Sequence, residues 1–98
     1  MTGLQERILA ATIMIPLGKV TTYSRLARHT KCKSIRAVGT ALHQNPDLVE
    51  VPCHRVVGSD GSLTGYVAGL PRKRELLMLE GVKFDEKGRV AAECIIDL

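Results

Sequence analysis

One short run of the sequence combines a nucleophile with groups that could activate it. Cys53 is preceded by Pro52 and followed directly by His54 and Arg55. A cysteine reacts as its thiolate, and a free thiol is only slightly ionised near neutral pH, so a reactive cysteine needs a neighbouring base or positive charge. Side chains of consecutive residues in an extended segment point to opposite sides. A cysteine followed by a histidine is therefore more often inert than catalytic, unless its surroundings support the reactive interpretation.

The cysteines do not form the pattern of a disulfide framework or of a metal site. Cys32, Cys53 and Cys94 are odd in number and widely spaced, which suits a reducing compartment. His29 and Cys32 could supply half of a metal site, but no second half with ligand spacing follows. We therefore expect no bound metal and no cofactor.

The start of the chain lacks the pattern of a signal peptide, and no apolar run approaches the roughly 20 residues that a membrane span needs. The sequence therefore predicts a cytoplasmic protein with no membrane contact. With 98 residues, no repeat and no linker, it also predicts a single domain over residues 1–98, with a tail of uncertain structure at 91–98.

Basic residues are segregated along the chain. The formal net charge is only +4, but no acidic residue lies between Glu6 and Asp47. The basic residues in that window are Arg7, Lys19, Arg25, Arg28, Lys31, Lys33 and Arg36. Such separation is typical of a face that binds phosphates, and a solvated basic surface without a ligand is the alternative.

Helical patterns dominate the first half of the chain. Apolar residues recur at helical spacing over residues 4–15, and Thr22 can cap a helix over residues 23–29. Ser34 can cap a third helix over residues 34–44. Two short helices joined by a tight turn indicate a helix-turn-helix. Gly39 has no side chain, so the third helix is narrow at this position. This allows either close packing inside the protein or close approach to another surface.

The second half contains less regular structure. Asn45 and Pro46 end the third helix, and residues 55–57 form a short buried strand. A helix follows over residues 71–80, with leucines 76, 77 and 79 supplying its apolar contacts, and residues 82–90 form a small hairpin. We place Ser59 and Lys73 on the surface. The sequence therefore predicts a mainly α fold with a small β component.

The Pro-Cys-His-Arg run of residues 52–55 occurs together with further motifs, namely VTTY at 20–23, SIRAVGTALHQNP at 34–46 and the Gly-Tyr pair at 65–66. In this combination the chain resembles the C-terminal domain of the O6-alkylguanine-DNA alkyltransferases over residues 4–84. The resemblance implies a winged helix-turn-helix-like fold and repair of DNA by irreversible transfer of an alkyl group from O6 of guanine to Cys53. A thioether offers water no easy leaving group, so each molecule should react once.

The resemblance also implies roles around the reactive cysteine. His54 acts through a water molecule as the base, Glu80 orients His54, and Pro52 and Arg55 support the site. Tyr23 crowds the phosphate beside the lesion and assists protonation of the leaving guanine. Asn45 is also assigned a catalytic role, because it connects the recognition helix to the active-site loop.

O6 of guanine lies inside the duplex, so the nucleotide must be extruded before a side chain can reach it. By the same resemblance, the helix of residues 34–44 enters the minor groove and Arg36 fills the space left by the extruded base. The other expected DNA-binding residues are Thr22, Tyr23, Ser34, Ala37, Gly39 and Thr40. The expected base pocket comprises Leu42, Val56, Tyr66, Val67 and Ala68, with the Val67 N–H on O6 and the Val56 carbonyl on the base edge.

Two other functions compete with this interpretation. Alkyltransferase-like proteins recognise the same damage without repairing it, but they have tryptophan at the acceptor position, where this chain has Cys53. A plain helix-turn-helix regulator would leave the Pro-Cys-His-Arg run unexplained. Many family members carry an N-terminal domain that this sequence lacks, and we expect the chain to act without it, as a monomer on double-stranded DNA containing O6-alkylguanine.

Overall fold

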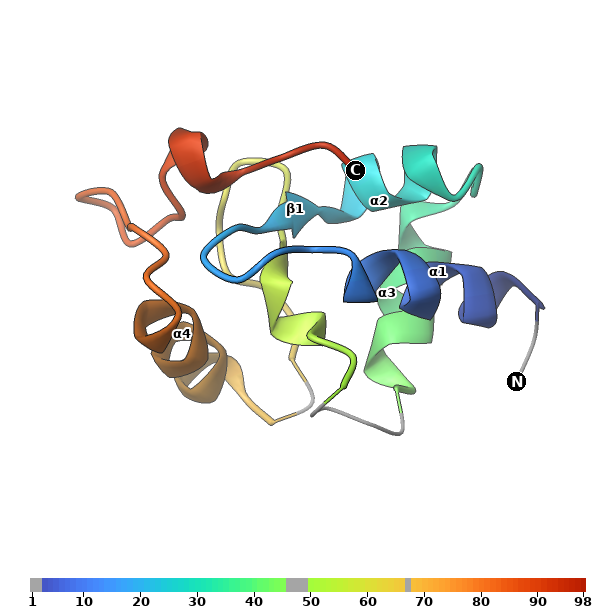
Figure 1. The fold of residues 1–98 in the computed structure, drawn as a ribbon, viewed down its shortest axis with the longest axis horizontal. Coiled ribbons are helices and arrows are strands. Elements are labelled where there is room, and N and C mark those ends of the chain that lie inside the picture. Colours follow the sequence, from blue (N-terminus) through green and yellow to red (C-terminus); the bar gives the residue numbers. More distant parts are fainter. Residues whose placement is uncertain (1–2, 46–49, 67) are drawn as a thin grey trace.

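The computed structural model describes residues 3–45, 50–66 and 68–98. Four α-helices and two very short strands follow one another in the order α1 (Gly3–Ile13), β1 (Thr21–Thr22), α2 (Tyr23–His29), α3 (Ile35–His43), β2 (Val56–Val57) and α4 (Leu70–Leu79). One 3-10 turn, Cys53–Arg55, precedes β2, and another, Ala92–Cys94, lies near the C-terminus (Figure 1). The expected fold class, mainly α with a small β component, is confirmed.

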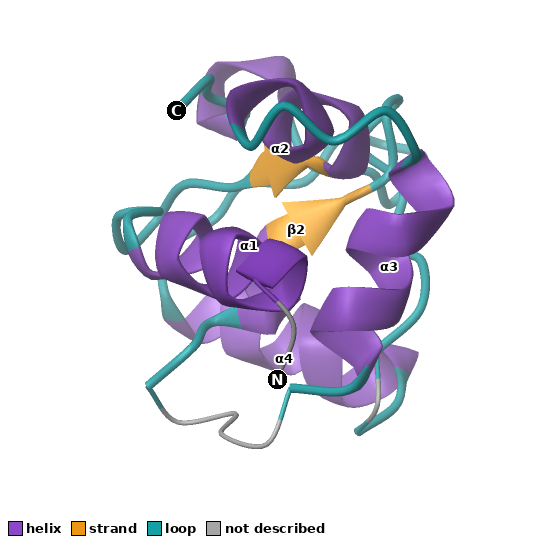
Figure 2. Cartoon of the chain, turned by 90° about the vertical axis from the view of Figure 1, so that its right-hand side faces the viewer, coloured by secondary structure: helices purple, strands orange, loops and turns teal. Residues whose placement is uncertain are grey.

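Helices α1, α2 and α3 enclose the larger of two apolar cores. Ile8 of α1, Leu26 of α2 and Val38 of α3 are fully buried in it, together with Val56 of β2. Figure 2 shows α1 and α3 side by side, with the two short strands between α1 and α2. Burial of each such aliphatic side chain contributes about 1.5–3 kcal/mol. This core therefore fixes α3 against the rest of the protein.

Helices α2 and α3 form the predicted helix-turn-helix, and both predicted caps are present. Thr22 Oγ1 accepts a hydrogen bond from the Arg25 N–H at 3.1 Å, and Ser34 Oγ accepts one from the Ala37 N–H at 3.1 Å. The turn between the helices reverses through Lys31, which has a φ of 58°. Each cap satisfies a backbone N–H that the first turn of a helix leaves without a partner.

The sheet was only partly predicted. Strand β2 was expected, whereas β1, whose Thr21 pairs in parallel with Val56, was not. The C-terminal segment then lies beside β1, where the Val20 N–H donates to the Cys94 carbonyl at 2.9 Å and the Ile96 N–H donates to the Val20 carbonyl at 2.8 Å. The expected hairpin over residues 82–90 is confirmed by an antiparallel bridge between Phe84 and Val90.

Helix α4 packs against a second, smaller core. The burial of two of its residues differs from the prediction. Leu77 is fully buried there with Val20 and Val57, whereas Leu79 is 76% exposed and does not supply the expected apolar contact. Lys73, expected at the surface, is 0% exposed. Lys73 lies one turn before Leu77, and residues four apart share one face of a helix, so both face the interior.

Leu77 and Leu79 therefore form a matched pair for testing this packing. We expect Leu77→Ala to lower the free energy of unfolding by about 2–5 kcal/mol, the usual cost of a large cavity in a core. Leu79→Ala should change it by less than about 0.5 kcal/mol, because its side chain is already in solvent. Urea unfolding followed by circular dichroism measures both, and equal losses would contradict the described position of α4.

Candidate active site

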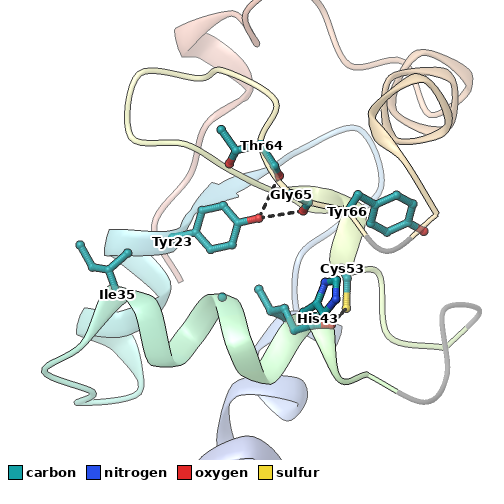
Figure 3. Close-up of a pocket in the computed structure, with 9 residues that line it drawn as sticks. Tyr23, Ile35, His43, Cys53, Thr64, Gly65 and Tyr66 are labelled. Atoms are coloured by element: carbon teal, nitrogen blue, oxygen red, sulfur yellow. Dashed lines mark hydrogen bonds between the residues drawn. The ribbon is translucent and has the colours of Figure 1, made fainter.

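Cys53 lies in the wall of a cavity of about 270 Å³ between α3 and the loop that carries Tyr66. Figure 3 shows Tyr23 and the loop of Thr64 and Gly65 across the cavity from α3. Besides Cys53, the lining residues are Tyr23, Ile35, Gly39, Leu42, His43, Thr64, Gly65 and Tyr66. The 3-10 turn at residues 53–55 places the thiol at this cavity while Cys53 as a whole is only 5% exposed. A ligand can therefore reach a sulfur that bulk water barely contacts.

Asn45 connects the thiol to the end of α3. Its Nδ2 lies 2.8 Å from Cys53 Sγ and donates a hydrogen bond to the Val51 carbonyl at 3.2 Å. Burial raises the pKa of the Cys53 thiol, although the hydrogen bond from Asn45 and the positive charge of Lys73 act in the opposite direction. The thiol is thus protonated at rest, and a base must take its proton before it reacts.

His54, the residue after the thiol, is bound to a carboxylate. Its Nε2 lies 2.8 Å from Glu80 Oε2. Burial lowers the pKa of His54, against the opposing effect of Glu80, so the imidazole is neutral near neutral pH. The other ring nitrogen, Nδ1, is buried and has no hydrogen-bond partner within the described ranges. With Nε2 on Glu80, Nδ1 is the nitrogen that remains to accept a proton.

Arg55 holds the same carboxylate from the other side. Its Nε donates to Glu80 Oε1 at 2.8 Å, its Nη2 donates to Glu80 Oε2 at 2.9 Å, and its Nη1 donates to the Ile15 carbonyl at 2.8 Å. Burial alone would raise the pKa of Glu80, but the hydrogen bonds from Arg55 and His54 outweigh it and hold the pKa below its usual value. The bidentate pair fixes the direction of the carboxylate that His54 binds.

Two glycines shape the backbone around Glu80. Gly81 has a φ of +89° and ends α4 immediately after Glu80. Gly18 has a φ of +85°, and a Cβ atom there would lie 3.3 Å from the Glu80 carbonyl oxygen. The loop after α1 therefore approaches the end of α4 closely, which brings the Ile15 carbonyl within reach of Arg55.

Lys73 is the main functional candidate that the sequence did not reveal. Its Nζ donates to the Val56 carbonyl at 2.6 Å and to the Thr64 carbonyl at 2.8 Å, and it lies 5.7 Å from the centre of the Tyr23 ring. Burial lowers the pKa of Lys73 to about 8, while the charge of Cys53 opposes that shift. A signal was present, because Lys73, Leu77 and Glu80 recur at the spacing of one helix face.

Tyr23 and Tyr66 form the aromatic part of the cavity wall. The Tyr23 hydroxyl donates to the Thr64 carbonyl at 3.1 Å or to the Gly65 carbonyl at 3.3 Å. Burial raises the pKa of Tyr23, so its hydroxyl keeps its proton near neutral pH. The Tyr66 ring meets the His54 ring edge-on, with 6.4 Å between their centres. The cavity thus has apolar ring surfaces on which a planar base could pack.

The structure places some expected pocket residues elsewhere. Leu42 and Tyr66 line the cavity, but Val56 is fully buried and its carbonyl accepts the Lys73 hydrogen bond. Ala68 is exposed and is not part of the lining, and Val67 lies outside the described residues. Four lining residues were not expected, namely Ile35, His43, Thr64 and Gly65.

Helix α3 presents most of the expected DNA-binding residues at the surface. Ser34, Arg36 and Thr40 are exposed, and Ala37 and Gly39 are half-buried. A Cβ atom on Gly39 would have nothing within 4 Å, so this glycine does not serve close packing inside the protein. Thr22, which was also expected to bind DNA, is 2% exposed, and its hydroxyl caps α2.

Within the described residues, no helix is long and apolar enough to cross a membrane. In the same part of the chain, no group of three or more His, Cys, Asp or Glu side chains is placed to hold a metal ion. The three cysteines, all of them described, are free thiols.

The helix-turn-helix and the adjacent cavity lined by Cys53 define a class, a helix-turn-helix protein with a cysteine at its site. Residues 3–82 match the family model described as the DNA-binding domain of 6-O-methylguanine DNA methyltransferase. The chain belongs to this family, as the resemblance predicted. It is 43% identical over 88 residues to the methylated-DNA--protein-cysteine methyltransferase of Haemophilus influenzae, covering 89% of this chain and 49% of that protein. The enzyme of that name from Methanosarcina barkeri is 46% identical over 80 residues, which cover 81% of this chain and 51% of that protein.

Solved structures agree with the family assignment. Mycobacterium tuberculosis OGT in complex with DNA matches with a TM-score of 0.80 and 44% identity, over 83% of this chain and 51% of that one. S. pombe Atl1, in complex with damaged DNA containing O6-carboxymethylguanine, matches with a TM-score of 0.84 and 29% identity, over 100% of this chain and 98% of that one. The chain thus spans about half the length of the curated relatives and nearly all of Atl1.

The lowered pKa of Glu80 predicts how stability depends on pH. Its contribution is present above the ordinary glutamate pKa of 4.5 and is lost as the pH falls below it. We expect Glu80→Gln to cost about 2 kcal/mol or more at neutral pH, and to flatten the fall in unfolding free energy below about pH 5.

Urea unfolding at a series of pH values measures this difference. The matched control is Glu75→Gln, on the same helix, whose side chain is 59% exposed and pairs with Arg72. The control should behave like the wild type. A Glu80→Gln protein with wild-type stability and pH dependence would show that the carboxylate does not anchor the site.

The position of Lys73 predicts its effect on the thiol. Lys73→Met removes a buried positive charge that favours the thiolate, so the pKa of Cys53 should rise. Alkylation of Cys53 by iodoacetamide near neutral pH should then slow by about threefold or more, equivalent to half a pKa unit. Peptide mass spectrometry follows Cys53 separately from Cys32 and Cys94.

Arg74→Met is the matched control, because it removes a neighbouring cation that is exposed. It should leave the pH profile of Cys53 alkylation unchanged. A thermal melt of each variant separates an electrostatic effect from loss of the fold. Identical profiles for the wild type and a folded Lys73→Met protein would rule out the proposed influence on the thiol.

Proposed function

We propose that this protein repairs DNA by transferring an alkyl group, such as methyl, from O6 of guanine to Cys53. The observation that carries the proposal is the placement of the Cys53 thiol in a cavity with two tyrosines, directly beside the His54–Glu80–Arg55 network. Membership of the methyltransferase family supports the same chemistry. The name of the relatives, methylated-DNA--protein-cysteine methyltransferase, specifies a protein cysteine as the methyl acceptor. In this chain, Cys53 is the described cysteine that lines the cavity.

In the proposed reaction His54 Nδ1 takes the proton of the thiol, with a water molecule as the relay. The ion pair with Glu80 stabilises the resulting imidazolium, which favours the thiolate. The sulfur then attacks the alkyl carbon, a carbon–sulfur bond forms, and the electron pair of the breaking carbon–oxygen bond moves to O6 of guanine. A proton from the Tyr23 hydroxyl makes guanine a neutral leaving group. The imidazolium then returns its proton to the tyrosinate through solvent, so that the thiol proton is the one finally transferred to guanine.

The same geometry accounts for a single turnover. The product is a thioether within a largely buried site, and a thioether has no good leaving group for hydrolysis. None of these steps requires a cofactor. The protein would therefore be consumed as a stoichiometric reagent, one molecule for each lesion.

Access to the lesion requires an extruded nucleotide, and α3 supplies the surface for it. We propose that α3 enters the minor groove with Arg36 in the space left by the base, while Gly39 lets the backbone of the extruded nucleotide approach the helix. The minor groove carries little sequence information, which suits repair of lesions in any context. The protein would work as a monomer on DNA in the cytoplasm, where free cysteines are stable.

The match to nearly the whole of Atl1 favours one other candidate, a protein that binds the lesion without repairing it. Cys53 distinguishes the two functions, because a lesion binder has no use for a thiol whose neighbours can remove its proton. Both candidates predict binding of the damaged base in the cavity. Only the transferase predicts a covalent change of the protein.

Intact-protein mass spectrometry tests the proposal. After incubation with an oligonucleotide duplex carrying O6-methylguanine, we expect the wild type to gain one methyl group and Cys53→Ser to gain none. Both proteins should bind the duplex in an anisotropy assay. An unchanged mass for a wild type that still binds the lesion would instead assign the chain to the lesion binders.

A further inference from the structure

The C-terminal segment, residues 94–98, takes part in none of the steps proposed above. It lies beyond residue 82, where the match to the family model ends, whereas the match to Atl1 covers 100% of this chain. In Figure 1 the segment runs from the last 3-10 turn across β1 and ends beside α2. It therefore lies against the strand that precedes Tyr23 and the helix that begins with Tyr23.

Two residues shortly before Tyr23 bind this segment. The Val20 N–H donates to the Cys94 carbonyl at 2.9 Å, and the Ile96 N–H donates to the Val20 carbonyl at 2.8 Å. Thr21 is fully buried, and its hydroxyl donates to the Ile96 carbonyl at 2.8 Å. One side chain and two backbone hydrogen bonds thus join the start of β1 to the C-terminal segment.

The segment also reaches α2. Asp97 lies 3.5 Å from Arg25 of α2, in an exposed pair that adds little stability by itself. Leu98 packs against the larger core. The C-terminal segment therefore spans the junction between β1 and α2, and Tyr23 is the first residue after that junction.

Proton transfer from Tyr23 depends on where α2 begins. The Tyr23 hydroxyl, which lies beside the Thr64 and Gly65 carbonyls, must come within about 2.6–3.2 Å of the group that it protonates. A tyrosine hydroxyl is far from its own backbone, so a small rotation at the start of α2 moves the hydroxyl by a larger distance. A misplacement of about 1 Å can slow a reaction on the order of 100-fold.

From these contacts we infer that the C-terminal segment positions Tyr23 for proton transfer, with Thr21 as the side chain that connects the two. Thr21 touches no reacting atom, so it is a positioning residue. The inference rests on the proposed function, in which Tyr23 is the proton donor. It also gives a role to Thr21 of the VTTY motif, in which Thr22 caps α2 and Tyr23 donates the proton.

Two substitutions of Thr21 test the side-chain connection. Thr21→Val removes the hydroxyl and nearly keeps the shape of the side chain, whereas Thr21→Ser keeps the hydroxyl and loses a methyl group. In single-turnover reactions with an O6-methylguanine duplex, we expect Thr21→Val to slow methyl transfer by about tenfold. Thr21→Ser should stay within about twofold of the wild type, because its hydroxyl can still bind the Ile96 carbonyl. Intact-protein mass spectrometry of quenched samples measures each rate.

Thr12→Val is the matched control. Thr12 is also fully buried, and its hydroxyl donates to the Ile8 carbonyl at 2.7 Å, but this bond lies within α1. The control therefore removes the same kind of buried hydroxyl at a position away from Tyr23. It should transfer the methyl group at the wild-type rate.

A second background separates positioning from a loss of stability. Tyr23→Phe removes the proton donor and should slow transfer at least as much as Thr21→Val does. In the Tyr23→Phe background, Thr21→Val should cause no further slowing, because the group that it positions is already gone. Alkylation of Cys53 by iodoacetamide releases iodide, which needs no proton, so Thr21→Val should leave that rate unchanged. A thermal melt shows whether each variant is folded.

Ile96→Pro tests the backbone connection, because proline lacks the N–H that donates to the Val20 carbonyl. Ile95, the preceding residue, has a φ of −91° and a ψ of 122°, a conformation that suits a residue before proline. We expect Ile96→Pro to slow methyl transfer when Tyr23 is present and to have no further effect in the Tyr23→Phe background.

The outcomes separate this inference from the proposed function. If the wild type transfers the methyl group and Thr21→Val is equally fast, or if Thr21→Val slows the Tyr23→Phe protein just as much, the segment does not act through Tyr23. The proposed transfer to Cys53 would then still stand. If Tyr23→Phe reacts at the wild-type rate, Tyr23 is not the proton donor, and the inference is overturned. A wild type that gains no methyl group would refute the proposed function itself.

Discussion

The carboxylate of Glu80 is the point on which the described site depends. It accepts hydrogen bonds from His54 and Arg55, and Arg55 in turn binds the Ile15 carbonyl after α1. The end of α4, the 3-10 turn with the cysteine and the loop after α1 are thereby held together by a single side chain. Without the Glu80 carboxylate, three donor atoms, one on His54 and two on Arg55, would lose their acceptor. That loss is larger than the loss of an exposed ion pair.

Lys73 has a similar structural role on the cavity side of the site, where it also joins separate segments. Its ammonium group connects the Val56 carbonyl of β2 to the Thr64 carbonyl of the loop that Tyr23 also binds. It thus joins the strand after the cysteine to the opposite wall of the cavity. A buried lysine that is bound to carbonyls and close to a thiol both braces the pocket and favours the thiolate. The reactive centre is supported from α4 twice, by Glu80 at its end and by Lys73 one turn from its start.

Much of the fold could be predicted from the sequence because its signals are local. Thr22 and Ser34 are good caps, the apolar residues of α1 to α3 recur at helical spacing, and Gly81 ends α4, so the helices were placed within a few residues. Strand β1 and the C-terminal segment could not be predicted. Strand β1 pairs with Val56 and Val57, and the C-terminal segment pairs with Val20. Both pairings join backbone segments that lie far apart in the sequence, so local side-chain patterns do not reveal them.

The candidate site was likewise only partly predictable from the sequence. The Pro-Cys-His-Arg run drew attention to the thiol, and the family resemblance implied the roles of His54 and Glu80. The structure brings the imidazole and the carboxylate together. Lys73 was misplaced because a lysine is rarely buried, and its burial depends on two carbonyls from distant segments. His43 and Ile35 were missed because their position beside Gly39 becomes a cavity wall only when the loop of residues 64–66 closes over α3.

A crystal structure of Cys53→Ser bound to a duplex containing O6-methylguanine tests the central claim most directly. The account predicts the damaged base outside the stack, in the cavity between Tyr23 and Tyr66, with its methyl group against residue 53 and α3 in the minor groove. A base that remains stacked in the duplex, or a complex that contacts DNA through another face, would contradict it.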